Sequence, residues 1–132
     1  MRISVDTNVL VRLLVVDDED QARAAAQALE QASLVAIGLV TLCEVAWVVK
    51  SAYKIPPQQV AAFFRKLISI QKVQLDLSAV EAGLAHVEAG GDFADGIIAH
   101  EGSWLGGETF VSFDKRAVKL LSDRGTPTKL LR

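Results

Sequence analysis

The chain has 132 residues, of which 51% are hydrophobic and 23% are charged. This length and composition are typical of one α/β domain with a core large enough to fold without disulfides, so we expect a single domain over residues 1–132. Lysine and arginine number 14 against 16 aspartates and glutamates, and the resulting net charge of -2 does not by itself indicate a nucleic-acid-binding protein.

Few residues are available for disulfide or zinc chemistry. Cys43 is the only cysteine, which excludes an intrachain disulfide and favours a reducing, cytoplasmic setting. With His86 and His100 as the only histidines, no zinc-ligand pattern can be assembled. The amino-terminal run 3–16 is apolar, but polar and charged residues interrupt the part that would be the core of a signal peptide. No other stretch approaches the roughly 20 apolar residues of a membrane span, so we expect a cytoplasmic protein without membrane association.

Strand and helix patterns alternate along the whole chain. Short apolar runs predict strands at residues 3–5, 34–37, 73–77, 109–113 and 130–131. Amphipathic spacing predicts helices after Asp6, after the acidic turn 17–20, from Thr41 to before Pro56, from Pro57, from Ser78 to Gly90, from Asp92, and between Asp114 and Gly125. This alternation predicts a central parallel sheet of four or five strands with helices on both faces.

Two acids directly follow predicted strands. Asp6 ends the first strand, and Asp114 comes directly after a late one. The carboxyl ends of parallel strands share one rim, where α/β proteins place their chemistry, so these two acids can face the same crevice. The alternative interpretation is that Asp6, or Thr7 beside it, only caps the following helix.

Two further acids lie near helix starts without a cation at helical spacing. Glu44 belongs to a Thr41-x-x-Glu44 capping box, so its side chain can return to the Thr41 amide. Its neighbours are apolar, however, and an unpartnered carboxylate on such a face is costly. Asp95 sits in the first turn of its helix, for which Asp92 already provides a cap. Gly96 costs this helix about 1 kcal/mol relative to alanine, and the sequence gives no reason for it.

Four carboxylates at one rim repel one another unless divalent cations lie between them. Hard oxygen ligands are preferred by magnesium and manganese, and an incomplete protein cage suits magnesium because it keeps waters and takes phosphate oxygens from a substrate. A metal-bound water can attack a phosphodiester without a histidine base. No usual Ser-His or Cys-His arrangement, P-loop or Gly-x-Gly-x-x-Gly run competes. The spacing therefore indicates metal-dependent phosphoryl chemistry.

Four motifs in register carry a family resemblance across essentially the whole chain. They are Asp6-Thr7-Asn8-Val9-Leu10-Val11-Arg12, Glu44 in Thr-Leu-Cys-Glu-Val, Asp92-Phe93-Ala94-Asp95 with Ile98-Ala99, and Ser112-Phe113-Asp114-Lys115. Together they resemble the PIN-domain family and, within it, the VapC-like toxins of toxin-antitoxin pairs. The resemblance implies a three-layer α/β/α fold and a Mg2+- or Mn2+-dependent endoribonuclease that hydrolyses RNA phosphodiester bonds. It also implies a homodimer held inactive by a cognate antitoxin.

Site residues follow from the resemblance by position. Asp6, Glu44 and Asp95 match the metal-binding acids of the family, and Asp114 matches a fourth acid that is less constant. Asn8 resembles the residue that orients the first acid, Ser112 stands where the family often has threonine, and Asp92 matches a frequent extra acid beside the metal or at the cap. Gly96 replaces the bulkier residue usual after the third acid. With Asp6 assigned to the metal, Thr7 becomes the better candidate for the helix cap.

RNA binding requires cations. Arg12, Lys115 and Arg116 lie nearest the acids in sequence, although a plain surface role is an equal alternative for each. Trp47 and Trp104 could stack on bases or line an antitoxin groove, and core packing is the preferred interpretation for Trp47. Two other functions stay open: a PIN nuclease in RNA processing or acting on DNA, and a PIN fold that binds RNA or a partner without cutting.

Overall fold

A computed structural model describes all 132 residues as a mixed α/β fold of seven helices and five parallel strands. The chain forms two compact units, unit 1 over Met1–Asp76 and unit 2 over Leu77–Arg132. None of the helices combines the length and the apolar character needed to cross a membrane.

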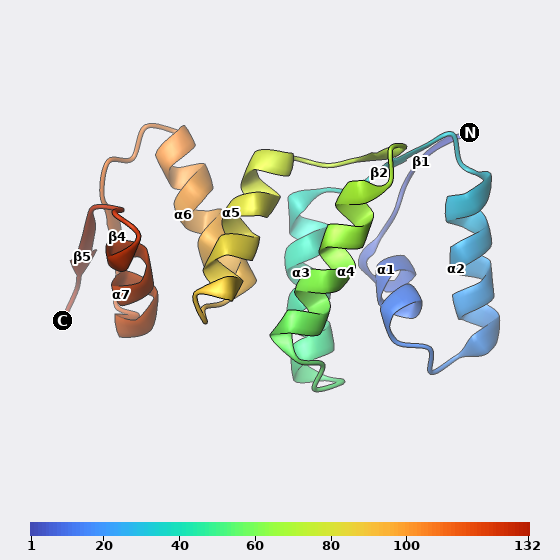
Figure 1. The fold of residues 1–132 in the computed structure, drawn as a ribbon, viewed down its shortest axis with the longest axis horizontal. Coiled ribbons are helices and arrows are strands. Elements are labelled where there is room, and N and C mark those ends of the chain that lie inside the picture. The colour runs from blue at the N-terminus through green and yellow to red at the C-terminus, as the bar shows by residue number, and fades with distance from the viewer. The chain divides into compact units, whose positions relative to one another are not determined.

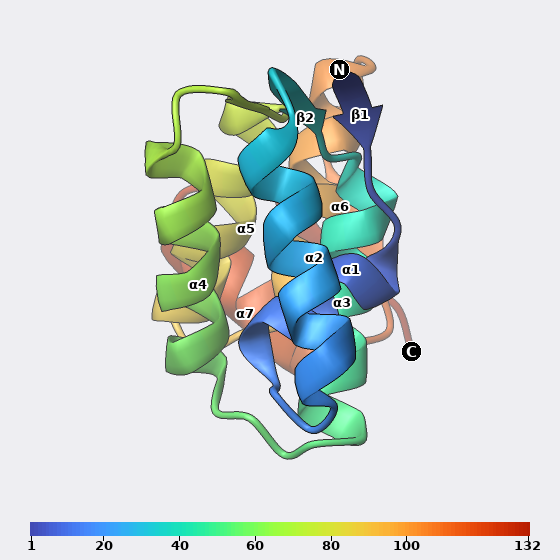
Figure 2. The ribbon, with the colours of Figure 1, turned by 90° about the vertical axis from the view of Figure 1, so that its right-hand side faces the viewer.

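Unit 1 is built from two strand-to-strand crossovers. Its elements are β1 (Arg2–Ser4), α1 (Thr7–Leu14), α2 (Glu19–Gln31), β2 (Leu34–Ala36), α3 (Leu39–Ser51), α4 (Pro57–Ser69) and β3 (Val73–Gln74). The strands pair in parallel in the order β1-β2-β3, with Val35 opposite both Ile3 and Val73. Parallel neighbours need long connections, and here two helices fill each of them. β1 and β2 run side by side at one end of the unit 1 helices (Figures 1 and 2).

Apolar stripes on the helices close the core of unit 1 around β2. Leu10 on α1, Leu42 on α3 and Val35 on β2 are fully buried. α4 begins at Pro57, whose fixed φ suits the first helical position, and buries Phe64. The stripes predicted from the sequence are therefore the faces that pack.

Lys72, just before β3, caps the far end of α2. Its Nζ donates hydrogen bonds to the carbonyl oxygens of Leu29, Glu30 and Ala32 at 2.5, 3.0 and 3.1 Å. A helix leaves its last carbonyls unpaired, and a cation there also suits the helix dipole. This side chain therefore ties the end of α2 to the start of β3.

Unit 2 contains a helix pair and a two-stranded parallel sheet. Its elements are α5 (Leu77–Glu88), α6 (Phe93–Trp104), β4 (Phe110–Ser112), α7 (Lys115–Asp123) and β5 (Thr128–Leu130). β4 pairs with β5, with Val111 opposite Lys129, and α7 connects the two strands and contacts both (Figure 1).

Glycines let α5 and α6 approach closely. A Cβ on Gly96 would lie 2.7 Å from the Cβ of His86 and 2.9 Å from the Cα of Gly83. A Cβ on Gly83 would in turn lie 2.7 Å from the Phe93 ring. Gly96 therefore weakens its own helix but permits the packing of two helices, which explains the glycine that the sequence left without a reason.

The parallel α/β class is confirmed, while the number of strands in the sheet differs from expectation. A single sheet of four or five strands was predicted, and the five strands instead form one sheet of three and one of two. The predicted strand 73–77 is shortened to Val73–Gln74 because Leu77 already begins α5. An apolar run does not by itself distinguish a strand end from a helix start.

The capping box predicted at Thr41 is wrong. α3 begins at Leu39 with Gly38 as its N-cap, so Thr41 already lies inside the first turn. Leu39 stands three residues before Leu42, so the apolar stripe extends the helix by a turn. α5 likewise begins at Leu77, so Ser78 is helical, and its Oγ lies 3.3 Å from the Nε2 of His100.

Candidate functional site

Asp6 connects β1 to α1. It is the N-cap of α1, and its Oδ1 accepts a hydrogen bond from the Val9 N–H at 3.3 Å. Thr7 is the first helical residue, so the expectation that Thr7 would be the cap is wrong. Asn8 is exposed in the same turn and makes no hydrogen bond to Asp6. Since capping uses one carboxylate oxygen, the exposed Asp6 keeps its second oxygen for another ligand.

Glu44 lies in the second turn of α3. It is exposed, and because α3 starts at Leu39 its carboxylate is not occupied in a capping box. β1 and β2 are parallel neighbours with Ser4 opposite Ala36, so Asp6 and the start of α3 lie at the same end of unit 1. Helices α1 and α3 are also in contact. Unit 1 therefore carries its two predicted acids on neighbouring helices.

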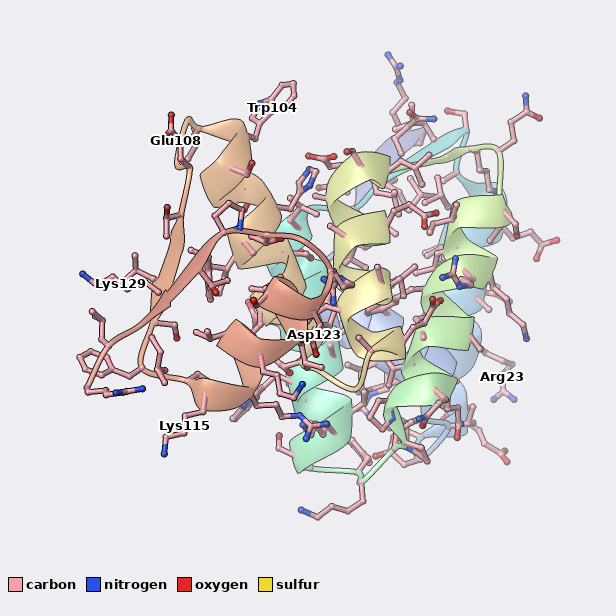
Figure 3. The ribbon with its side chains drawn as sticks, turned by 60° about the vertical axis from the view of Figure 1, so that its left-hand side comes forward. Arg23, Trp104, Glu108, Lys115, Asp123 and Lys129 are labelled. Atoms are coloured by element: carbon pink, nitrogen blue, oxygen red, sulfur yellow. The ribbon has the colours of Figure 1, made fainter.

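Trp47 lies one turn beyond Glu44 and is 69% exposed, so its predicted place in the core is wrong. Val45 and Val49 carry the buried side of α3, and Trp47 falls between them on the outer side. Trp104 is 84% exposed at the end of α6, from which its ring projects (Figure 3). Both indoles are accessible.

Asp114 repeats in unit 2 the arrangement of Asp6. It follows β4, is the N-cap of α7, and accepts a hydrogen bond from the Ala117 N–H at 3.0 Å through Oδ1. The backbone N–H of Asp114 donates to the hydroxyl of Ser112 at 2.9 Å. Ser112, the last residue of β4, therefore fixes the backbone that leads into the cap.

Asp92 and Asp95 begin α6. Asp92 is the N-cap residue, but its side chain makes no capping hydrogen bond and it is exposed. Asp95 lies in the first turn and is half-buried. The role of cap predicted for the Asp92 side chain is therefore not seen, although its position is as expected.

His86 is a buried polar residue of unit 2 that sequence reasoning missed. Its side chain on α5 is 0% exposed, its Nδ1 lies 3.2 Å from Nη1 of Arg124, and its Nε2 has no hydrogen-bond partner. Burial lowers the pKa of His86 below its usual 6.5, and the charge of Arg124 lowers it further. Ala79, Gly83 and His86 follow a helical stripe of buried positions, which is the signal that could have identified it.

The three predicted RNA-binding cations differ in their surroundings. The Arg12 guanidinium forms an ion pair with Asp17 and lies 3.4 Å from the Tyr53 hydroxyl. Arg116 donates to the carbonyl oxygen of Gly90 from Nε at 3.1 Å and from Nη2 at 2.5 Å. Lys115 is exposed and points away from α7 (Figure 3). Of the three, only Lys115 has a charged group without a hydrogen bond or ion pair to the protein.

Unit 2 contains a cavity of about 610 Å³. It is lined by residues from the second half of α6, β4 and the segment after α7, among them Ile98, His100, Thr109, Val111 and Arg124. Ile98 in this lining is 57% exposed. None of the four acids lines this cavity.

The candidate ligands occur as one pair in each unit. No three histidine, cysteine, aspartate or glutamate side chains gather into a group that could hold a metal ion. The donors are of the right kind, since Mg2+ prefers hard oxygens and is often bound by only one or two carboxylates together with waters and substrate phosphates. The carboxylate chemistry of the four acids therefore suits magnesium or manganese.

Comparison with known proteins agrees with the motifs. The family model of the PIN domain matches residues 3–120, a span that includes both pairs of acids. No curated protein matches the chain. PIN domains are generally nucleases, and PIN nucleases usually use divalent metals. The chain belongs to the PIN-domain family.

Proposed function

We propose that this protein is a Mg2+- or Mn2+-dependent endoribonuclease and the toxin of a type II toxin-antitoxin pair. The observation that carries the proposal is the repeated strand-acid-helix arrangement of Asp6 and Asp114. Each acid follows a parallel strand, caps a helix through one oxygen and leaves the other oxygen for a ligand. Glu44 and Asp95 complete the proposed metal-binding set.

The carboxylates have distinct tasks in this proposal. The capping hydrogen bonds hold the side chains of Asp6 and Asp114 in one orientation, which reduces the entropy lost when a cation binds. Glu44 and Asp95 add oxygen ligands from the faces of α3 and α6. A bound divalent cation supplies positive charge to the scissile phosphate and makes a coordinated water a stronger acid.

Supporting roles follow from the positions of the neighbouring residues. Ser112 fixes the backbone of Asp114 through its hydroxyl. We assign Asn8 and Asp92 to the surroundings of the metal, because both are exposed and close in sequence to a proposed ligand. Lys115 is our first choice for an RNA phosphate contact, because its exposed ammonium is a mobile point charge. A homodimer and a cognate antitoxin are the proposed protein partners.

The direct test is RNA cleavage with Mg2+ or Mn2+ by Asp95→Asn, with Glu101→Gln as the matched control from the same helix. We expect Asp95→Asn to reduce cleavage by about 100-fold or more and to weaken Mn2+ binding in calorimetry, because a ligand charge is lost. The exposed Glu101 lies outside the set, so its variant should cleave at the wild-type rate. Wild-type cleavage by Asp95→Asn, with an unchanged circular dichroism spectrum, would contradict the proposed site.

A second experiment separates the toxin from the other functions. The chain is expressed in cells with and without the neighbouring gene, and the ends of cleaved cellular RNA are mapped. Growth arrest that the neighbouring gene relieves is the expected result. Harmless expression with cleavage of purified RNA or DNA would favour a processing nuclease, and the absence of Mn2+ binding would favour a module that binds without cutting.

A further inference from the structure

Arg116 joins the start of α7 to the turn between α5 and α6. It is the second residue of α7, and both its Nε and its Nη2 donate to the carbonyl oxygen of Gly90, at 3.1 and 2.5 Å. Gly90 has a φ of +98°, a left-handed conformation that favours glycine, and a Cβ there would lie 2.9 Å from Arg116 Nη2. The turn therefore has the backbone and the free space that this contact needs.

The same turn is held from its other side by His86. A Cβ on Gly91 would lie 2.3 Å from the His86 Nε2, so the glycine packs directly against the imidazole ring. That ring is fully buried, and Arg124 at the end of α7 is hydrogen-bonded to its Nδ1. Two arginines from the two ends of α7 thus reach the end of α5 and the turn that follows it.

The turn and the start of α7 each lead directly to a proposed metal ligand. Asp114 stands two residues before Arg116 and caps the same helix. Gly91 is followed by Asp92 and the first turn of α6, which contains Asp95. Only residues 91–94 therefore separate the Arg116 contact at Gly90 from Asp95, and this segment is sterically confined.

We infer that Arg116 is a positioning residue that holds Asp114 and Asp95 at a fixed separation, and that it acts through the Gly90 carbonyl rather than through RNA. The inference rests on the proposed function in so far as these two acids are ligands. A guanidinium suits this task because its planar fork can place two N–H donors on one acceptor, which an ammonium cannot do with the same geometry. Lys115, the adjacent cation, has no such contact.

The test compares Arg116→Gln and Arg116→Lys with Lys115→Gln, which removes the same charge one residue away. Three quantities are measured on the full chain: Mn2+ affinity by calorimetry, kcat and KM for RNA cleavage, and amide hydrogen exchange of residues 91–97. For Arg116→Gln we expect Mn2+ affinity to fall about 10-fold, kcat to fall with KM unchanged, and exchange to become faster. Arg116→Lys keeps the charge and can still donate to the Gly90 carbonyl oxygen, so each quantity should lie between its values for Arg116→Gln and the wild type.

Lys115→Gln should instead raise KM for RNA and leave Mn2+ affinity and exchange unchanged. If Arg116→Gln behaves in the same way, Arg116 is an RNA contact and the inference is overturned. If the wild-type protein neither binds Mn2+ nor cuts RNA, the proposed function fails, and hydrogen exchange alone then decides the inference: unchanged exchange overturns it and faster exchange supports it. Circular dichroism of Arg116→Gln and Arg116→Lys separates a local change from a failure to fold.

Discussion

His86 shows how one buried side chain links the chemistry of unit 2 to its packing. The ring lies beside Gly91 and the Cβ of His86 lies beside Gly96, and a methyl group added at either glycine would collide with this side chain. Arg124 can only donate, so Nδ1 must accept and the proton of the neutral ring must lie on Nε2. That N–H has no hydrogen-bond partner. Protonation of Nδ1 would remove the acceptor of Arg124 and bury a charge beside its guanidinium, so protonation of this ring is costly.

The lowered pKa of His86 predicts a pH dependence of stability. In the unfolded chain the imidazole titrates near 6.5, and in the folded chain it titrates lower because burial disfavours the charged form. Between these values the unfolded state binds more protons, so the free energy of unfolding should fall as the pH is lowered from 7 through 6.5 and below. His86→Gln should reduce this slope in urea unfolding experiments. Equal slopes in wild type and His86→Gln would refute the prediction.

At the scale of elements, the crossing of α5 and α6 is the most demanding contact in unit 2. Glycines on both helices bring the backbones together, and the first turn of α6 carries Asp95. A change in this crossing would therefore move a proposed ligand as well as the core. At position 96, helix propensity favours alanine, whereas the packing of α5 against α6 favours glycine.

We predict that packing outweighs propensity at Gly96. In Gly96→Ala, the helix gains about 1 kcal/mol of propensity, but the new Cβ would lie 2.8 Å from the Ala82 carbonyl oxygen and 2.9 Å from the Gly83 Cα. Because these are backbone atoms, the helices must separate, and we expect a net loss of about 1–3 kcal/mol in chemical denaturation. Gly102→Ala on the same helix has no atom within 4 Å and should be neutral or stabilising. Equal effects of the two substitutions would contradict this account.

The positions of most helices could be predicted from the sequence, because the apolar stripes that drive their packing are local patterns. The stripes of α1, α2, α4 and α7, and the Gly90-Gly91 end of α5, appear where predicted. Helix starts were less predictable. The four-residue pattern at Thr41 fits a capping box, but Leu39 adds one more apolar position upstream and burial extends the helix. The prediction for Trp47 was wrong because a large apolar side chain suggests a core residue. Trp47 instead lies on the exposed side of α3.

At the scale of the whole molecule, the proposed ligands are divided between the two units. Unit 1 contributes Asp6 and Glu44, and unit 2 contributes Asp95 and Asp114. Sequence could place each acid after a strand or near a helix start, since those signals are local. It could not give the pairing of strands far apart in the chain, which depends on contacts that no short pattern encodes.

Metal binding by the proposed acids predicts a gain in the stability of the protein. A cation that binds only the folded state at 100 times its Kd adds about 2.7 kcal/mol to the free energy of unfolding. We expect saturating Mn2+ to raise the thermal midpoint of the wild type, and Asp6→Asn and Asp114→Asn each to reduce the shift, because each removes the charge of a proposed ligand. Asparagine still caps a helix, so both variants should keep the metal-free midpoint. A full shift in both variants would contradict the assignment of these two acids as metal ligands.

The hydrogen bonds of Lys72 have a consequence for the order in which the chain becomes structured during synthesis. Its Nζ satisfies carbonyl groups of α2, and Leu29 precedes it by 43 residues. At ribosomal rates of about 5–20 residues per second, Lys72 is synthesised about 2–9 seconds after Leu29. During that interval its carbonyls depend on water, so the last turn of α2 stays frayed until β3 emerges. A nascent chain shorter than residue 72 therefore lacks the cap that completes unit 1.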